Sequence, residues 1–257
     1  MPPISATIIA KNEAERIADA IKPLQGLVDD ILVVDSGSTD ETCAIAEQMG
    51  ARVIENAWIG YGPQKRFAED EALHDWVLNL DADEVLTDEA VGEIRVLKDG
   101  PEPRYPGYRI RTVNVYPGAV RPRLFADFHN YIRLYDKRVM RFPDSLTHDA
   151  VTVPASIKVG QIKAPCLHYS IVSLEQLAAK LDRYTDLQAV ELKKNRVSVI
   201  ARLPFEYGAQ FLKQYIGRRH FTGGLFGMKV AHTVAASKVQ RLLKFLRAGT
   251  LAAADKR

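Results

Sequence analysis

Short runs of apolar residues recur through the first part of the chain, and each run ends at polar residues. The runs cover Ile4–Ala10, residues 31–34 and residues 76–80. Apolar runs of this length between turn residues predict buried strands. The intervening positions predict helices, one ending near Leu27 and one beginning near residue 41. This alternation predicts an α/β fold, with a mostly parallel sheet covered by helices.

Carboxylate and amide side chains follow all three apolar runs. Asn12 and Glu13 come after the first run, Asp35 closes the second, and Asp81 and Asp83 follow the third. The carboxyl ends of parallel strands meet at one edge of a sheet, and α/β folds bind their ligands there. We therefore expect these side chains to share one ligand site.

The two aspartates that follow the third run suggest metal chemistry. Carboxylate oxygens are ligands that Mg²⁺ and Mn²⁺ prefer, and Mg²⁺ usually completes its shell with water and substrate phosphate. The pair therefore favours a metal-bridged diphosphate. The alternative is an acidic loop that only increases solubility and caps the next helix, formed by Asp81, Asp83, Glu84, Asp88 and Glu89.

Three motifs in this order resemble the family 2 glycosyltransferases, which have a GT-A fold. They are TIIAKNE at Thr7–Glu13, VDSGSTD at Val34–Asp40 and LDADE at Leu80–Glu84. The segment WIGYGPQKRFA at Trp58–Ala68 is similar to a narrower branch, the β-1,4-glucosyltransferases of lipopolysaccharide core biosynthesis. The resemblance covers most of residues 4–192.

This resemblance implies a UDP-sugar donor, with UDP-glucose first, and direct displacement at the anomeric carbon with inversion. It implies a lipopolysaccharide core sugar or another lipid-linked glycan as the acceptor. Asp83 would hold Mg²⁺ or Mn²⁺, and Asp81 would lie near the ribose or the metal. The positions expected to bind the donor are Ala10, Asn12, Glu13, Asp35, Lys65 and Asp81.

Lys65 follows the turn Gly60-Tyr-Gly62 and stands at the beginning of an expected helix. The resembled family has a basic residue that contacts the nucleotide, which implies this role for Lys65. The alternative is an ordinary solvated helix face, and that is the expectation for Arg66.

Asp149 is the expected catalytic base. In the resembled branch this place carries a histidine followed by an acid, usually glutamate, and the acid is taken as the base. Here the pair is His148 and Asp149. The side chain of aspartate is one methylene shorter than that of glutamate. The alternative is a loop carboxylate that accepts hydrogen bonds from backbone amides.

His168 is the second expected metal ligand. In many GT-A enzymes a histidine late in the catalytic domain completes the metal shell, and His168 is similar in position. A histidine beside apolar residues can equally be a core residue with satisfied hydrogen bonds, and both interpretations stay open.

Charge divides the chain into two regions. The net charge of the whole chain is +3, but residues 193–257 contain 14 Lys and Arg against Glu206 and Asp255, a net of +12. This leaves −9 for residues 1–192. We expect a GT-A domain over 1–192 and a basic helical region over 193–257, where apolar residues recur at helical spacing.

Basic amphipathic helices favour association with an anionic membrane surface. No uncharged apolar run reaches about 18 residues, so a membrane-spanning helix is not expected. The alternative is a helical cap packed on the domain, with a solvated basic face. Nucleic acid is not an expected partner, because no recognised binding motif is present.

The remaining signals concern compartment and competing functions. Cys43 and Cys166 lack metal-ligand spacing and are expected as free thiols in a reducing compartment. The chain begins without a secretory signal, so we expect a cytoplasmic protein, peripheral on the inner face of the cytoplasmic membrane. The competing functions are a nucleotidyltransferase acting on sugar phosphates and a non-catalytic membrane-surface adaptor.

Overall fold

The computed structural model describes residues 2–145, 150–191 and 196–254. The chain forms two compact units. The sheet unit comprises Met1–Val113 and Phe128–His168, and the helical unit comprises Asn114–Asp127 and Tyr169–Arg257. The expected division between residues 192 and 193 lies outside the described residues and stays a prediction.

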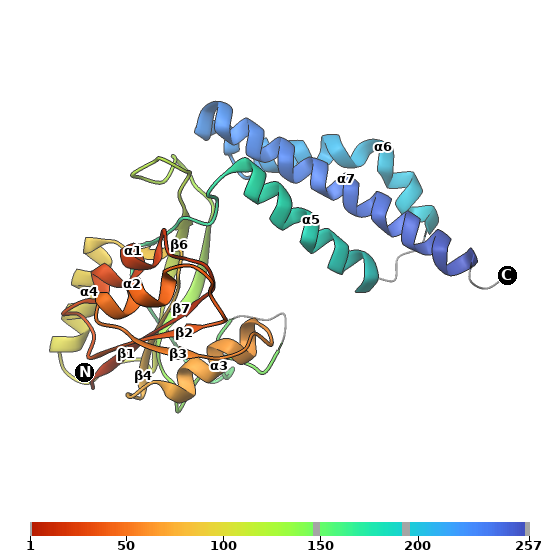
Figure 1. Cartoon of the computed structure of the whole chain (residues 1–257). Coiled ribbons are helices and arrows are strands. Elements are labelled where there is room, and N and C mark those ends of the chain that lie inside the picture. The colour runs from red at the N-terminus through yellow and green to blue at the C-terminus, as the bar shows by residue number, and fades with distance from the viewer. Residues whose placement is uncertain (1, 146–149, 192–195, 255–257) are drawn as a thin grey trace. The chain divides into compact units, whose positions relative to one another are not determined.

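Four parallel strands form the first half of the sheet (Figure 1). They are β1 (Ile4–Ala10), β2 (Asp30–Asp35), β3 (Arg52–Glu55) and β4 (Trp76–Asp81), in the spatial order β3-β2-β1-β4. The chain places β2 and β4 on opposite sides of β1. Such a change of direction in strand order opens a crevice at the carboxyl ends of the strands.

The second half of the sheet is largely antiparallel. β7 (Phe128–Asp136) pairs with β4, and β6 (Gly107–Asn114) pairs with β7. β5 (Glu84–Leu86) pairs with β9 (Cys166–His168), and β8 (Gly160–Gln161) lies beside β6. This half brings residues far along the chain against the strand that carries the paired aspartates.

Helices cover both faces of the parallel strands. α1 (Ile17–Ile21), η1 (Lys22–Leu24), α2 (Thr42–Gln48) and α4 (Asp88–Asp99) contribute to the core on one face. α3 (Tyr61–Glu71) packs on the other face against β1 and β2. The fold class expected from the apolar runs is confirmed. The first helix is shorter than expected, because α1 ends at Ile21 and continues as η1 only to Leu24.

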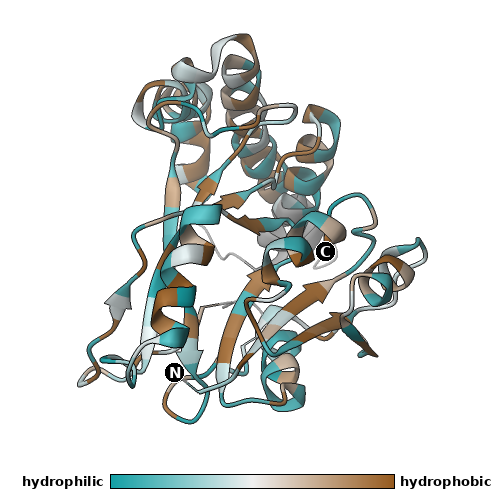
Figure 2. Ribbon diagram, turned by 90° about the vertical axis from the view of Figure 1, so that its left-hand side faces the viewer, coloured by the Kyte–Doolittle hydropathy of each residue, from teal (hydrophilic) through white to brown (hydrophobic). Residues whose placement is uncertain are grey.

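Alternation along β1 explains why both faces need a cover. Ile8 belongs to the core beneath α1, α2 and α4, whereas its neighbour Ile9 belongs to the core beneath α3. Successive side chains of a strand point to opposite faces, so a strand with apolar side chains on both faces must be covered on both sides. Figure 2 shows the hydrophobic residues along the central strands in brown.

The helical unit contains three long helices, α5 (Leu174–Glu191), α6 (Arg196–Leu212) and α7 (Gly224–Ala254). η2 (Lys213–Gly217) and η3 (His220–Gly223) connect α6 to α7. α7 packs against both α5 and α6 (Figure 1). The expected basic helices in the last part of the chain are therefore confirmed.

Small and apolar side chains let α7 approach its neighbours. Ala231, Ala235 and Leu242 of α7 are buried. On the same helix, Lys244 forms ion pairs with Asp182 and Asp186 of α5, the latter at 2.6 Å. Among the described residues, no helix is both long and apolar enough to cross a membrane.

Candidate active site

The register of the parallel strands brings the polar strand ends together. Ala10 of β1 pairs with Asp35 of β2, and its neighbour Ile9 pairs with Asp81 of β4. β1 separates the two aspartates, so their backbones are roughly 10 Å apart, two strand spacings. The carboxyl ends of β1, β2 and β4 therefore lie side by side, as expected.

Hydrogen bonds tie the loop after β1 to the loop after β2. The backbone N–H of Asn12 donates to Ser38 Oγ at 2.8 Å, and Asn12 Oδ1 accepts from the Thr39 N–H at 2.8 Å. Asn12 has a φ of 55°, a left-handed conformation that asparagine tolerates better than most residues. The Glu13 N–H donates to Thr42 Oγ1 at 2.8 Å. The two loops therefore form one wall.

Asp35 shapes the second loop from within. One of its oxygens, Oδ2, accepts from the N–H groups of Gly37 at 2.8 Å and Ser38 at 2.7 Å, and Oδ1 accepts from the Ser38 hydroxyl. Gly37 has a φ of 85°, which favours glycine. Asp35 is buried, so its carboxylate orders the backbone that faces the crevice.

Two cations hold Asp81 in place. Lys65 Nζ lies 2.8 Å from Asp81 Oδ1, and Arg133 Nη2 lies 3.2 Å from Asp81 Oδ2. Burial by itself would raise the pKa of Asp81, but the charges of Lys65 and Arg133 outweigh burial and hold this pKa below its usual value. Asp81 is therefore ionised, and both of its oxygens are engaged by the protein.

Lys65 is an interior residue. Its side chain is only 1% exposed, and its ammonium lies 5.4 Å from the centre of the Phe142 ring. A cation buried this deeply needs an anionic partner, and Asp81 supplies it. This contact fixes one oxygen of the carboxylate, and the expected contact of Lys65 with the nucleotide stays a prediction. Its neighbour Arg66 donates to the backbone carbonyl of Phe142 at 2.8 Å.

Arg133 joins the same cluster from β7, and the sequence interpretation missed it. Its guanidinium donates to Asp81, to Glu84 and, at 3.1 Å, to Asn79 Oδ1. Burial raises the pKa of Glu84 to about 6, against the lowering effect of Arg133. The available signal was an arginine inside an alternating apolar segment, Tyr131–Tyr135, where a lone charge demands a partner.

Asp83 and His168 form a separate pair beside this cluster. His168 Nε2 lies 3.3 Å from Asp83 Oδ2, because β9 places His168 opposite Glu84. Burial raises the pKa of Asp83, yet the hydrogen bond and charge of His168 outweigh it and lower this pKa. Burial lowers the pKa of His168, but Asp83 outweighs it and raises this pKa. The two expected metal ligands therefore lie together.

The donor set fits a divalent cation that keeps open positions. Asp83 offers a carboxylate oxygen and His168 an imidazole nitrogen, whereas both Asp81 oxygens already face cations. Within the described ranges, no group of three or more His, Cys, Asp or Glu side chains is arranged to hold a metal. A hard cation here would take its remaining ligands from water and phosphate, as Mg²⁺ commonly does.

The other expectations have different outcomes. Asp149, the expected base, and its neighbour His148 lie outside the described residues, so their placement stays a prediction. Asn12, Glu13 and Asp35 lie in the joined loops described above. Cys43 and Cys166 are both free thiols, as expected.

The mostly parallel sheet with helices on both faces is the arrangement expected of a GT-A glycosyltransferase. A model of Glycosyl transferase family 2 matches residues 5–158, more than half of the chain. The chain is also 40% identical to an uncharacterised glycosyltransferase of Rickettsia felis, over 95% of this chain and 89% of that protein. The chain therefore belongs to glycosyltransferase family 2, which favours sugar transfer over nucleotidyl transfer or a non-catalytic adaptor.

Two further similarities are more distant. The lipopolysaccharide core biosynthesis glycosyltransferase LpsC of Rhizobium meliloti is 27% identical, over 91% of this chain and 88% of that protein. A crystal structure of glucosyl-3-phosphoglycerate synthase from Mycobacterium tuberculosis, with Mn²⁺, UDP and glucosyl-3-phosphoglycerate, is 20% identical with a TM-score of 0.43. It covers 69% of this chain and 75% of that one.

We expect Arg133→Met to destabilise the sheet unit by about 3–5 kcal/mol at pH 8, because it leaves the buried Glu84 and the half-buried Asp81 without a shared cation. The loss should shrink at pH 5. The folded wild type binds a proton at Glu84 near pH 6 rather than 4.5, and loss of Arg133 removes an effect that lowers this pKa. Glu84 of the folded variant is therefore protonated at pH 5, and a protonated Glu84 needs no cation. Urea unfolding at both pH values measures the difference.

Arg95→Met is the matched control, because Arg95 is exposed on α4 and should change stability by less than about 0.5 kcal/mol. Adding Glu84→Gln to Arg133→Met should recover part of the loss at pH 8. An Arg133→Met protein as stable as the wild type at pH 8 would show that the cluster does not need this cation.

Proposed function

We propose that this chain transfers glucose from UDP-glucose, with inversion and with Mg²⁺ or Mn²⁺, to a lipopolysaccharide core sugar or another lipid-linked glycan. The observation that carries the proposal is that Asp81 and Asp83 have different partners. Asp81 is neutralised by Lys65 and Arg133, while Asp83 pairs with His168 and, among the described residues, forms no ion pair with a lysine or arginine. Similarity to LpsC supports the acceptor class.

Each group has one task in the proposed reaction. The loops carrying Asn12, Glu13 and Asp35, next to Ala10, hold the uracil and the ribose. Asp81, fixed from behind by Lys65, orients the ribose. Asp83 and His168 hold the divalent cation, which when bound neutralises the charge that develops on the departing diphosphate.

Bond formation and proton transfer then take place on the opposite face of the sugar. The acceptor hydroxyl oxygen attacks the anomeric carbon as the bond from that carbon to the UDP oxygen breaks. Asp149 takes the hydroxyl proton as general base. The displacement is direct, so the anomeric configuration inverts and UDP leaves with the bonding electron pair.

An exposed apolar face on α6 supports a membrane-associated acceptor. Val197, Ile200 and Leu212 of α6 and, in the following η2, Ile216 are 55–74% exposed. Phe205 beside them is 74% exposed. An apolar face on a strongly basic helical region suits the boundary of an anionic bilayer, so we place the protein on the inner face of the cytoplasmic membrane.

Asp83→Asn should lower metal-dependent release of UDP from UDP-glucose by roughly 10²–10³-fold, because it removes charge stabilisation while keeping the shape of the side chain. Asp88→Asn is the matched control, since Asp88 is exposed on α4 and should retain activity. The measurement is coupled UDP detection with each cation and with a chelator. Full wild-type turnover in excess chelator would refute the metal mechanism.

Asp149→Asn should lower turnover by roughly 10²–10⁴-fold while leaving UDP-glucose affinity nearly unchanged, because the amide cannot accept the acceptor proton. Asp149→Glu should retain most of the rate, and the exposed Asp144→Asn serves as control. Single-turnover kinetics and donor titration separate rate from binding. Lost donor affinity with an unchanged rate would make Asp149 a binding residue.

Replacing Val197, Phe205 and Leu212 with serine should weaken binding to phosphatidylglycerol vesicles at least about tenfold, because each residue buries apolar surface in the bilayer boundary. The control replaces Leu73 and Val96, exposed apolar residues of the sheet unit, with serine. Vesicle sedimentation at rising salt should also show weaker binding. Equal retention by both variants would argue for a solvated helical cap.

A further inference from the structure

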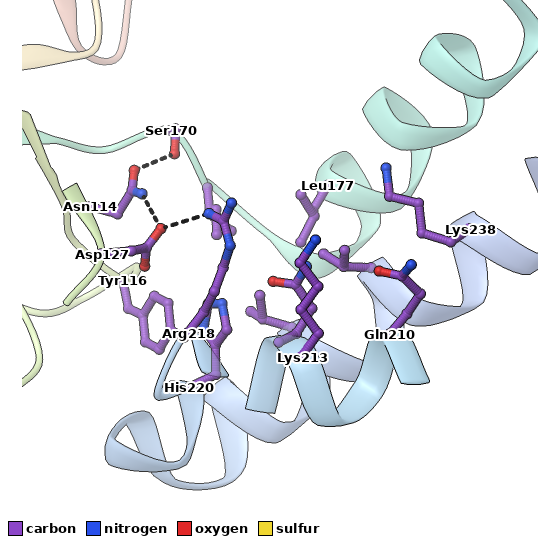
Figure 3. Close-up of a pocket in the computed structure, with 14 residues that line it drawn as sticks. Asn114, Tyr116, Asp127, Ser170, Leu177, Gln210, Lys213, Arg218, His220 and Lys238 are labelled. Carbon is purple, nitrogen blue, oxygen red and sulfur yellow. Dashed lines mark hydrogen bonds and ion pairs between the residues drawn. The ribbon is translucent and has the colours of Figure 1, made fainter. Parts of the chain in front are cut away.

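The helical unit contains a cavity of about 360 Å³ between its own elements. Its walls are formed by residues of α5, α6, η2, η3 and α7, together with residues of the segment Asn114–Asp127 (Figure 3). A cavity of this volume is at the small end of the usual range for small-molecule sites. It consists entirely of residues from the helical unit and includes none of the expected donor-binding or metal-binding residues.

One end of the cavity is satisfied by its own hydrogen bonds. Asp127 Oδ2 accepts from the Asn114 amide at 3.1 Å and lies 3.5 Å from Arg218 Nη1 (Figure 3). The other oxygen, Oδ1, accepts from Arg123 at 2.6 Å. The Tyr116 hydroxyl bonds to His220 Nδ1. Burial, followed by the charge of Arg123, lowers the pKa of His220, so this imidazole is neutral at pH 7.

The other end of the cavity carries excess positive charge. Lys213 and Lys238 line it together with the side-chain amides of Gln210 and Gln214. Within the part of the chain that the structure describes, neither lysine forms an ion pair. The nearby Glu206 accepts instead from Arg202 at 2.9 Å and from Gln210 at 3.1 Å.

The charge balance of the whole lining agrees with this picture. Three cations, Lys213, Arg218 and Lys238, face one carboxylate, Asp127, which Arg123 and Arg218 already engage. Burial lowers the pKa of Lys238, and Arg241 and Lys213 lower it further, against an opposing effect of Glu206. Like charges held close together are costly, and a bound anion would remove the cost.

The remaining wall is apolar. Ile171 and Leu177, with Val230 and Val234 of α7, line the same cavity. A free inorganic anion gains nothing from such a surface, whereas the carbon skeleton attached to a phosphate ester loses unfavourable contact with water there. Cations and amide donors at one end, with an apolar wall beside them, therefore match an organic phosphate.

We propose that this cavity binds the phosphomonoester group of an organic phosphate, with Lys213 and Lys238 contacting the phosphate oxygens and the apolar wall contacting the carbon skeleton. Two sources share this chemistry, a phospholipid headgroup and a phosphorylated sugar. Binding does not require sugar transfer, so it is measured without donor and without added metal. A failed transferase assay would therefore leave it standing.

The test is isothermal titration calorimetry of the full chain with monomeric dioctanoyl phosphatidic acid, glucose 6-phosphate and inorganic phosphate. We expect an organic phosphate to bind more tightly than inorganic phosphate. Tighter binding of the lipid assigns the headgroup source, and tighter binding of the sugar phosphate assigns the other. No binding of either at millimolar concentration, or equal binding of all three, would overturn the proposal.

Matched variants separate the cavity from the general basic surface. Lys213→Met with Lys238→Met should weaken binding at least about tenfold, because charge-assisted hydrogen bonds are lost. Lys180→Met with Lys229→Met removes the same charge from exposed positions on α5 and α7 outside the cavity, and should change affinity less than about threefold. Equal weakening by both pairs would show diffuse surface attraction and overturn the proposal.

A measurement on the wild type covers the case in which a variant misfolds. Acetylation of lysines by a water-soluble reagent, followed by mass spectrometry, reports the exposure of each amine in one sample. The tighter of the two organic phosphates should protect Lys213 and Lys238 but not Lys180 and Lys229. Uniform protection, or none, would count against the cavity.

Discussion

The buried contact of Asp81 with Lys65 and Arg133 is the constraint on which the rest of the sheet unit depends. It joins three elements, since Lys65 comes from α3, Asp81 from β4 and Arg133 from β7. Charges taken out of water are tolerated only when they are paired and hydrogen-bonded, so none of the three elements can shift alone. Glu84 belongs to the same network. Its carboxylate accepts from Arg133 and from the backbone N–H of Asp81, which closes the turn after β4.

This constraint gives two nearby aspartates different chemical properties. Asp81 has both oxygens engaged by cations of the protein, which fix its orientation. Asp83, past the end of β4, pairs with His168 from the short strand β9. Replacing the His168 contact of Asp83 with a metal-bound phosphate should cost less free energy than breaking the two ion pairs of Asp81. Family membership makes the chain a glycosyltransferase, and this asymmetry supports the proposed donor site at the carboxyl edge of the sheet.

The helical unit differs from the sheet unit in its excess of positive charge. Its cations outnumber its acids, and several stand within one cavity rather than on separated, solvated faces. Lys244 is matched by Asp182 and Asp186, and Arg202 by Glu206, so these cations stabilise the packing of the helices. Lys213 and Lys238 lack such partners among the described residues, and the proposed organic phosphate would supply the missing negative charge.

The sequence by itself determined the alternation of strands and helices, the grouping of Asn12, Asp35, Asp81 and Asp83 at one edge, and the basic helical tail. These follow from short-range periodicity and from turn residues such as Gly37, which act over a few positions. Only the tertiary structure decided that Arg133 would share Asp81 with Lys65, and that the interior ammonium of Lys65 would lie behind that carboxylate. The antiparallel pairing of β7 with β4 brings Arg133 to Asp81, which lies 52 positions earlier in the chain. The partner of a buried charge depends on such long-range packing, which no local pattern encodes.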